Sequence, residues 1–175
     1  VVDWGSAHGA ISLSVAKAFP NFSVLSLEGE YEGPPRPEHA HFSNMPKASL
    51  DRGMVDFQKL VAHRFDLKNH YACKGMLEEK TFKNLSDKKV FFDVQITIQT
   101  FHWLRRFYPS REQFEKGFAE HVQLARVTLI DLPPTGTSFP DTGAWNQGRT
   151  DMKQVAEEAL AAQNVRATVT LIDIP

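Results

Sequence analysis

A short segment near the start of the chain has the residue types of a ligand-binding turn. Residues 3–9, DWGSAHG, link an apolar run over residues 1–4 to a helical pattern over residues 10–19. Gly5 permits a sharp turn as the chain leaves a strand, and Gly9 allows a ligand to approach the backbone closely. Backbone N–H groups at the start of a helix favour a carboxylate or a phosphate. We therefore predict an anion-binding loop at this point.

An acidic residue follows at the end of the next apolar run. Glu28 lies 19 residues beyond Gly9 and directly follows a predicted strand over residues 22–27. A carboxylate at such a position can accept hydrogen bonds from both hydroxyls of a ribose. The loop and Glu28 together predict a site for a cofactor that contains a nucleoside. The structural alternative is a tight turn that binds no ligand.

Two cofactor classes use a loop of this kind. The dinucleotide pattern G-x-G-x-x-G matches the loop poorly, so a nicotinamide-dependent enzyme is the weaker alternative. The pattern D-x-G-x-G-x-G fits better: Asp3, Gly5 and Gly9 are in place and Ala7 replaces the middle glycine. Alanine is tolerated there if its φ is negative. On these residues, segment 1–30 resembles the first motif, helix and second strand of class I S-adenosylmethionine-dependent methyltransferases.

The resemblance implies roles for the residues of the loop and for Glu28. Glu28 would hold the ribose of S-adenosylmethionine. The methionine end of the cofactor would lie along Asp3, Gly5, Ser6, Ala7 and Gly9.

Residues 91–104 carry a second, weaker similarity to the same family. This stretch resembles the F-D-V…H-x-[IL] version of the fourth strand in members that methylate small molecules, or oxygen or carbon atoms. There Gln99 would contact the cofactor, and His102 is a candidate base because an imidazole accepts a proton near neutral pH. The acceptor pocket would include Thr100, Phe101 and Trp103. The alternative for His102 and Trp103 is packing at the end of the strand.

The remaining periodicity predicts the elements that position these residues. Apolar runs that alternate with helical patterns predict a Rossmann-like, doubly wound α/β fold with a mostly parallel sheet of about six strands between flanking helices, in three layers. The unbroken apolar run at 127–132 predicts a strand covered on both faces. Asp51 and the pair Ser110 and Gln113 are predicted helix caps, and Thr150 or Asp151 opens the last helix. The predicted strands cover 1–4, 22–27, 70–74, 90–98, 127–132 and 169–174, and the helices 10–19, 51–65, 77–86, 110–122 and 150–160.

Length and composition limit the remaining functions. The 175 residues contain no apolar run near the ~20 residues that a membrane helix needs. A net charge of −1 argues against a broad nucleic-acid surface, and a single cysteine fits a reducing compartment, the cytoplasm or an organelle interior. We expect a soluble chain with one methyltransferase-like domain over 1–175. That domain would lack the family's N-terminal extension and last edge strand. It would be a trimmed domain, the ordered part of a longer chain, or a reduced relative whose edge a partner covers.

Three further features complete the predictions. The run 38–41, EHAH, and Cys73 do not make a fixed set of metal ligands, so we predict no metal. Cys73 is expected to be a small buried apolar residue because no base can be paired with it. Loop 135–150 is long enough to form part of an acceptor pocket or to bind a protein partner, and loop 29–49 is a second predicted partner contact. The chain is therefore predicted to transfer a methyl group to a small-molecule or protein acceptor. The alternative is an inactive methyltransferase-like domain that serves as an interaction subunit of a larger assembly.

Overall fold

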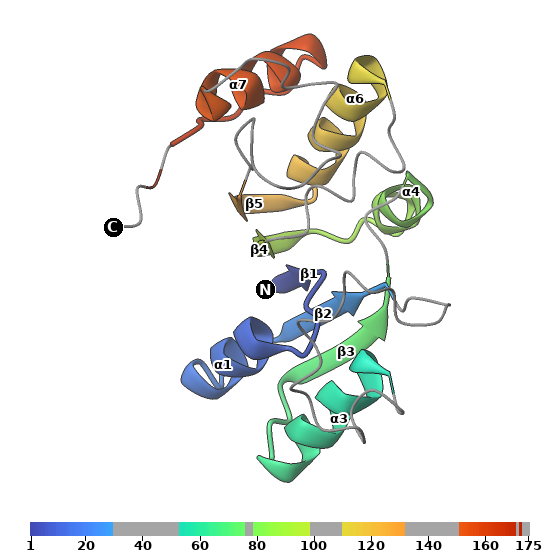
Figure 1. Ribbon diagram of the computed structural model, residues 1–175, viewed down its shortest axis with the longest axis vertical. Coiled ribbons are helices and arrows are strands. Elements are labelled where there is room, and N and C mark those ends of the chain that lie inside the picture. Colours follow the sequence, from blue (N-terminus) through green and yellow to red (C-terminus); the bar gives the residue numbers. More distant parts are fainter. Residues whose placement is uncertain (30–52, 76–78, 99–109, 132–150, 171, 173–175) are drawn as a thin grey trace, which may run out of the picture. The chain divides into compact units, whose positions relative to one another are not determined.

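The chain folds into parallel strands that alternate with helices. The computed structural model describes residues 1–29, 53–75, 79–98, 110–131, 151–170 and 172. In these residues every pair of strands is parallel and a helix separates consecutive strands, which confirms the Rossmann-like α/β fold (Figure 1). The chain divides into two compact units, Val1–Met76 and Leu77–Pro175, which we describe separately as the first and second units.

The first unit contains three parallel strands in the order β3-β2-β1. They are β1 (Val2–Trp4), β2 (Val24–Glu28) and β3 (His70–Lys74). Leu27 lies opposite Trp4 on one side and opposite Cys73 on the other. The strands therefore end at nearly the same level, so the loop after β1 and Glu28 at the end of β2 lie at one edge of this part of the sheet.

Two helices pack against the strands of the first unit. Helix α1 (Ala10–Ala18) contacts all three strands, and helix α3 (Met54–Arg64) contacts β3. Helix α1 ends before Phe19 and Pro20, where proline has no N–H to continue the helix. Helix α3 has Gly53 at its N-cap position, so the prediction that Asp51 caps this helix is wrong. The core of this unit is made of Val2, Trp4, Ala16, Val24, Leu27, Val55, Ala62 and Ala72.

The second unit contains the parallel pair β4 (Phe92–Thr97) and β5 (Ala125–Ile130) with helices α4 (Glu79–Asp87), α6 (Arg111–Val122) and α7 (Met152–Ala162). The predicted cap of α6 is confirmed: Ser110 Oγ accepts from Gln113 N, and Gln113 Oε1 accepts from Ser110 N, both at 3.2 Å. Asp151 caps α7 by accepting from Gln154 N at 3.0 Å. Buried apolar side chains of α6 and α7 pack together, among them Phe114, Phe118, Val155, Ala159 and Leu160.

Two predictions about the strands of the second unit differ from the structure. Residues 169, 170 and 172 are not part of a strand, so the described chain has five strands where six were predicted. Strand β5 is not covered on both faces, since Val127 and Leu129 are exposed. An apolar run of this length shows that a strand forms, but it does not show which faces are covered.

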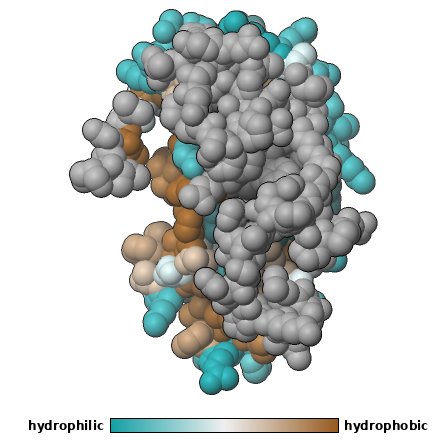
Figure 2. All heavy atoms as spheres, in the orientation of Figure 1, coloured by the Kyte–Doolittle hydropathy of each residue, from teal (hydrophilic) through white to brown (hydrophobic). Residues whose placement is uncertain are grey.

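Exposed aromatic side chains gather at the C-terminal ends of α1 and α3. Phe19 and Phe22 stack with ring centroids 5.3 Å apart, and Lys17 Nζ lies 5.8 Å from the centroid of the Phe65 ring. Each of the three phenylalanines is at least half exposed. Figure 2 shows hydrophobic spheres over the part of the surface where α1 lies. Exposed aromatic side chains that stack on each other, as Phe19 and Phe22 do, occur on surfaces that bind other molecules.

One further finding concerns membranes. Of the helices described above, none is long and apolar enough to cross a bilayer.

Candidate functional site

The loop after β1 folds back onto the end of β2. Gly5 N and Ser6 N both donate to the carbonyl of Leu27, at 2.8 and 3.3 Å, and Gly9 N donates to Ser6 O at 2.7 Å. Gly5 has φ 65° and Gly9 has φ 78°, a backbone region that glycine adopts without strain. The predicted sharp turn at Gly5 is therefore present. The loop is joined by its own backbone to the strand that carries Glu28.

Glu28 contacts the loop directly. Its Oε2 atom accepts a hydrogen bond from Ala7 N at 2.6 Å. The structure thus brings the acidic residue at the end of β2 and the middle of the loop together, although 21 residues separate them in the chain. A carboxylate oxygen has more than one lone pair, so this bond leaves Glu28 able to accept from other donors.

Ala7 departs from the predicted conformation. Its φ is 46°, in the left-handed region, whereas a negative φ was the condition for alanine to replace the middle glycine. The Cβ atom of an L-residue clashes with the following carbonyl oxygen in this region, at a cost of roughly 1–2 kcal/mol. The position that glycine occupies in the family pattern therefore has a glycine-like backbone here. Contacts around Ala7 must stabilise the strained conformation.

Asp3 is buried under the loop and caps helix α1 from the neighbouring strand. Gly9, the N-cap residue, has no side chain to accept from the first turn, and Asp3 Oδ2 accepts from Ser12 N at 3.2 Å. The negative charge also lies at the positive end of the helix dipole. Burial nevertheless raises the pKa of Asp3 to about 6, because removing the carboxylate from water outweighs its hydrogen bonds to Ser12.

Gln58, on helix α3, is a residue of this site that the sequence argument missed. Its side chain is fully buried, and its Nε2 atom donates to Ser6 Oγ at 2.9 Å and to Ala7 O at 2.6 Å. A Cβ added at Gly9 would lie 3.0 Å from both Cγ and Cδ of Gln58. Gly9 therefore lets α3 approach the loop closely. The spacing of Val55, Gln58 and Ala62 on one helix face was the available signal for a buried Gln58.

The rings of Trp4 and His8 make packing contacts. Trp4 is buried in the core of the first unit. His8 meets the Phe57 ring edge-on, with centroids 6.1 Å apart, and partial burial lowers the pKa of this histidine. Both side chains therefore pack the loop against its surroundings.

Several predicted residues lie outside the described part of the chain. These include the candidate base His102, the predicted cofactor contact Gln99 and the predicted acceptor pocket, Thr100, Phe101 and Trp103. The run EHAH at 38–41 and nearly all of loops 29–49 and 135–150 are also outside it. Cys73 is described, and it is exposed, so the prediction of a buried cysteine is wrong. His70 and Ala72 face the covered side of β3, and Cys73 points to the other side because side chains alternate along a strand.

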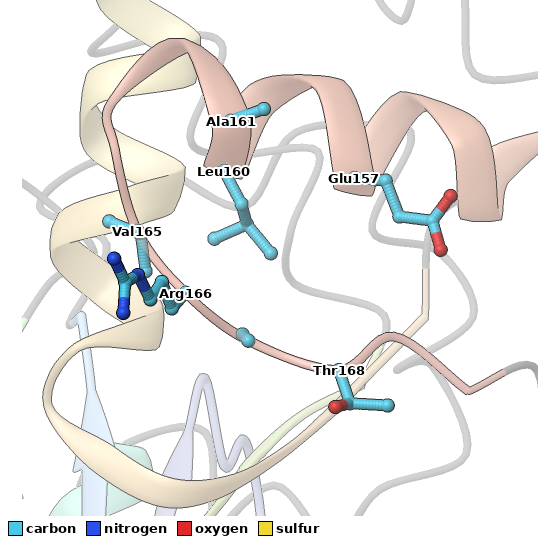
Figure 3. A pocket seen from close by; sticks show the side chains of 7 residues that line it. Glu157, Leu160, Ala161, Val165, Arg166 and Thr168 are labelled. Atoms are coloured by element: carbon cyan, nitrogen blue, oxygen red, sulfur yellow. The ribbon is translucent and has the colours of Figure 1, made fainter.

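A hollow of about 600 Å³ lies in the second unit. It is lined by Glu157, Leu160, Ala161, Val165, Arg166, Ala167 and Thr168. Figure 3 shows Leu160 pointing from α7 toward the segment that follows the helix. The hollow was not predicted from the sequence. Its lining combines apolar side chains with the carboxylate of Glu157, the guanidinium of Arg166 and the hydroxyl of Thr168.

Comparisons with known proteins give fold-level matches alone. No family model matches the chain, and no curated protein matches it in sequence. Among solved structures, that of WbdD matches with TM-score 0.50 and 12% identity over 76% of this chain and 24% of that chain. PKMT2 from Rickettsia typhi, solved in complex with AdoHcy, gives TM-score 0.44 and 14% identity over 71% of this chain and 18% of that chain.

At 12% identity, the likeness to WbdD shows the fold and leaves the chemistry open. This chain spans about a quarter of the length of WbdD. The fold of this chain is therefore similar to that of part of WbdD.

Proposed function

We propose that this chain is a class I methyltransferase domain that uses S-adenosylmethionine to methylate a small-molecule or protein acceptor. The observation that carries the proposal is the 2.6 Å hydrogen bond between Ala7 N and Glu28 Oε2. It joins the loop suited to a carboxylate with the acid suited to a ribose. The two parts of one cofactor would thus meet adjacent parts of one site.

The residues at this site fit the chemistry of that cofactor. Glu28 supplies an acceptor for ribose hydroxyls, and the start of α1 favours the methionine carboxylate through its N–H groups and dipole. Asp3 holds the first turn of α1 and so fixes the direction of those N–H groups. The cofactor, when bound, supplies a methyl group activated on a sulfonium sulfur. The chain then has to hold the acceptor in line with that methyl group, because orientation contributes most to such a transfer.

The acceptor side of the proposal rests on residues 99–103. Gln99 would contact the cofactor, and Thr100, Phe101 and Trp103 would border the acceptor. His102 would take the proton of an acceptor hydroxyl or amine. These roles follow from the resemblance of residues 91–104 to the family.

The test is a calorimetric titration of the purified chain with S-adenosylhomocysteine. We expect micromolar binding that is lost in Gly5→Arg, since φ at Gly5 is 65° and a long side chain fills the loop. Glu28→Gln retains an oxygen for Ala7 N and loses part of the acceptor capacity for the ribose. It should bind about tenfold more weakly, which corresponds to about 1.4 kcal/mol.

The matched control is Asp56→Asn. Asp56 is an exposed acid of the same unit, and its substitution changes the charge by the same amount. It should bind as the wild type does. Wild-type protein that shows no heat of binding at millimolar ligand would overturn the proposal.

A specific observation favours a second candidate, an interaction subunit without catalysis. Phe19, Phe22 and Phe65 are exposed near the C-terminal ends of α1 and α3, whereas the loop precedes the N-terminal end of α1. Sedimentation analysis of the wild type and of Phe19→Ser/Phe22→Ser tests this candidate. Self-association that the double variant abolishes, together with no cofactor binding, would favour it.

A further inference from the structure

The peptide groups on both sides of Ala7 are held by side chains from two different elements. Glu28, at the end of β2, accepts from Ala7 N at 2.6 Å. Gln58, on α3, donates to Ala7 O at 2.6 Å and to Ser6 Oγ at 2.9 Å. We call this arrangement of Glu28, Ala7 and Gln58 the loop clamp. It surrounds the one loop residue whose backbone is strained, with φ 46°.

The orientation of the Gln58 amide is fixed by its neighbours. Ala7 O can only accept a hydrogen bond, so the atom that faces it must be the donor Nε2. The Oε1 atom is buried, and among the described residues it has no hydrogen-bond partner. A buried acceptor without a donor is unfavourable by about 1–3 kcal/mol. Burying the Gln58 amide is therefore unfavourable in itself. This cost indicates that Gln58 has a role in addition to packing.

A strained backbone persists where surrounding contacts leave it no alternative. Alanine in the left-handed region returns to a negative φ when those contacts are removed. Such a rotation at Ala7 would move the N–H and carbonyl groups of the neighbouring residues. It would also turn the N–H of Ala7 away from Glu28, and the loop and the acid would separate.

We infer that Gln58 is a positioning residue that holds the glycine loop in its cofactor-binding conformation through the carbonyl of Ala7. The inference rests on the proposed function, because it names what prepares the same site. Glycine at position 7 would not need this support, since glycine adopts positive φ without strain. The need for Gln58 is thus a consequence of the alanine in the motif.

The test compares affinities for S-adenosylhomocysteine and uses Gln58→Met, which preserves the length of the side chain and removes the donor. We expect affinity to fall about tenfold in Gln58→Met. In Ala7→Gly/Gln58→Met, affinity should return to within about twofold of Ala7→Gly alone, because the glycine removes the strain. A role in overall stability alone would not produce this rescue.

Gln95→Met is the matched control. Gln95 is also fully buried, and its Nε2 atom donates to His121 O and Thr128 Oγ1, both at 2.7 Å, within the second unit. Its substitution should lower the melting temperature and leave the affinity unchanged. Hydrogen exchange of the Ala7 amide gives a second measurement, and we expect faster exchange in Gln58→Met than in the wild type.

The possible outcomes distinguish the positioning role of Gln58 from the proposed function. Wild-type binding with an unchanged affinity in Gln58→Met overturns the inference and leaves the proposed function standing. Weakened binding that Ala7→Gly does not restore also overturns it, since Gln58 would then act by another route. Absence of binding by the wild type overturns the proposed function itself.

Discussion

Ala7 has a backbone conformation that favours glycine. The φ of Ala7 is 46°, and the left-handed region costs an L-residue roughly 1–2 kcal/mol. Ala7→Gly removes this strain, although glycine also gives the unfolded chain more freedom, an opposing effect of about 0.4–1 kcal/mol. We expect the variant to raise the free energy of unfolding by roughly 0.5 kcal/mol, measured by urea denaturation.

Ala10→Gly is the comparison for that variant. Ala10 is exposed and begins helix α1, where glycine has no strain to relieve. The substitution should lower the free energy of unfolding by roughly 0.5–1 kcal/mol. If both glycine variants destabilise the chain equally, Ala7 does not have the conformation described above.

The buried carboxyl of Asp3 makes the stability of the first unit depend on pH. Burial raises the pKa of Asp3 to about 6, from 3.8 for the free side chain. Between these two values the folded chain binds more protons than the unfolded chain, so the contribution of Asp3 to stability falls as pH rises. Integrated over that window, the loss is on the order of 3 kcal/mol.

Asp3→Asn isolates this effect. Asparagine keeps an oxygen that can accept from Ser12 N and does not titrate. The free energy of unfolding of the variant minus that of the wild type should increase from pH 4 to pH 7, measured by urea denaturation at several pH values. A difference that stays constant over this range would contradict a raised pKa at Asp3.

At the scale of elements, Asn69 joins the end of α1 to the start of β2 and β3. Its Nδ2 atom donates to the carbonyls of Ala16, Phe19 and Phe22 at 3.0, 3.2 and 2.8 Å. Its own carbonyl accepts from Val24 N at 2.8 Å. One side chain thus satisfies backbone carbonyls left over at the helix C-terminus, and its backbone begins the pairing of two strands.

Asn69→Asp keeps the shape of this side chain and replaces the donor with oxygen. We expect the free energy of unfolding to fall by about 2 kcal/mol or more, because carbonyl oxygens would then face a carboxylate. Asn69→Ala should cost less, about 1–2 kcal/mol, since it only leaves the carbonyls without their donor. Thermal melts at neutral pH measure both. The reverse order of stability would show that the donor is not what matters at position 69.

The elements themselves were predictable because their signals are local. The capping box of Ser110 and Gln113 and the strand at 70–74 depend on residues within a few positions of each other. Predictions that depend on contacts between distant parts of the chain were less successful. The segment at 169–174 has a strand-like pattern, yet its described residues pair with no strand. Pattern predicts the preference of a segment, and neighbours decide whether it pairs.

In the candidate site, too, local signals were predictable and contacts between distant residues were not. The glycines and Glu28 were found from their spacing, since a ligand-binding turn requires residue types at fixed intervals. The contact between Gln58 and Ala7 spans 51 residues and was not found. No interval in the sequence marks it, because the approach of α3 to the loop depends on how both pack against the strands. The positive φ of Ala7 has the same origin.

At the scale of the whole molecule, Asp3 in the first unit and His121 in the second are buried titratable groups that respond to pH in opposite ways. In the second unit, His121 Nε2 lies 2.9 Å from Thr97 Oγ1, and the side chain is fully buried. Burial lowers the pKa of His121 to about 3. Between that value and about 6.5 the unfolded chain binds the extra proton, so the second unit loses stability as pH falls.

Acidification from pH 6.5 to 4.5 should therefore weaken the second unit while the contribution of Asp3 to the first unit rises. Hydrogen exchange followed by mass spectrometry measures both at once, after correction for the intrinsic effect of pH on exchange. Peptides from β4 and α6 should lose protection relative to peptides from β1 and α1. His121→Gln removes the titrating group of the second unit and should reduce the difference between the units to the part that comes from Asp3. A loss of protection that is the same in both units of the wild type would show that burial of His121 and Asp3 does not set the response of this chain to acid.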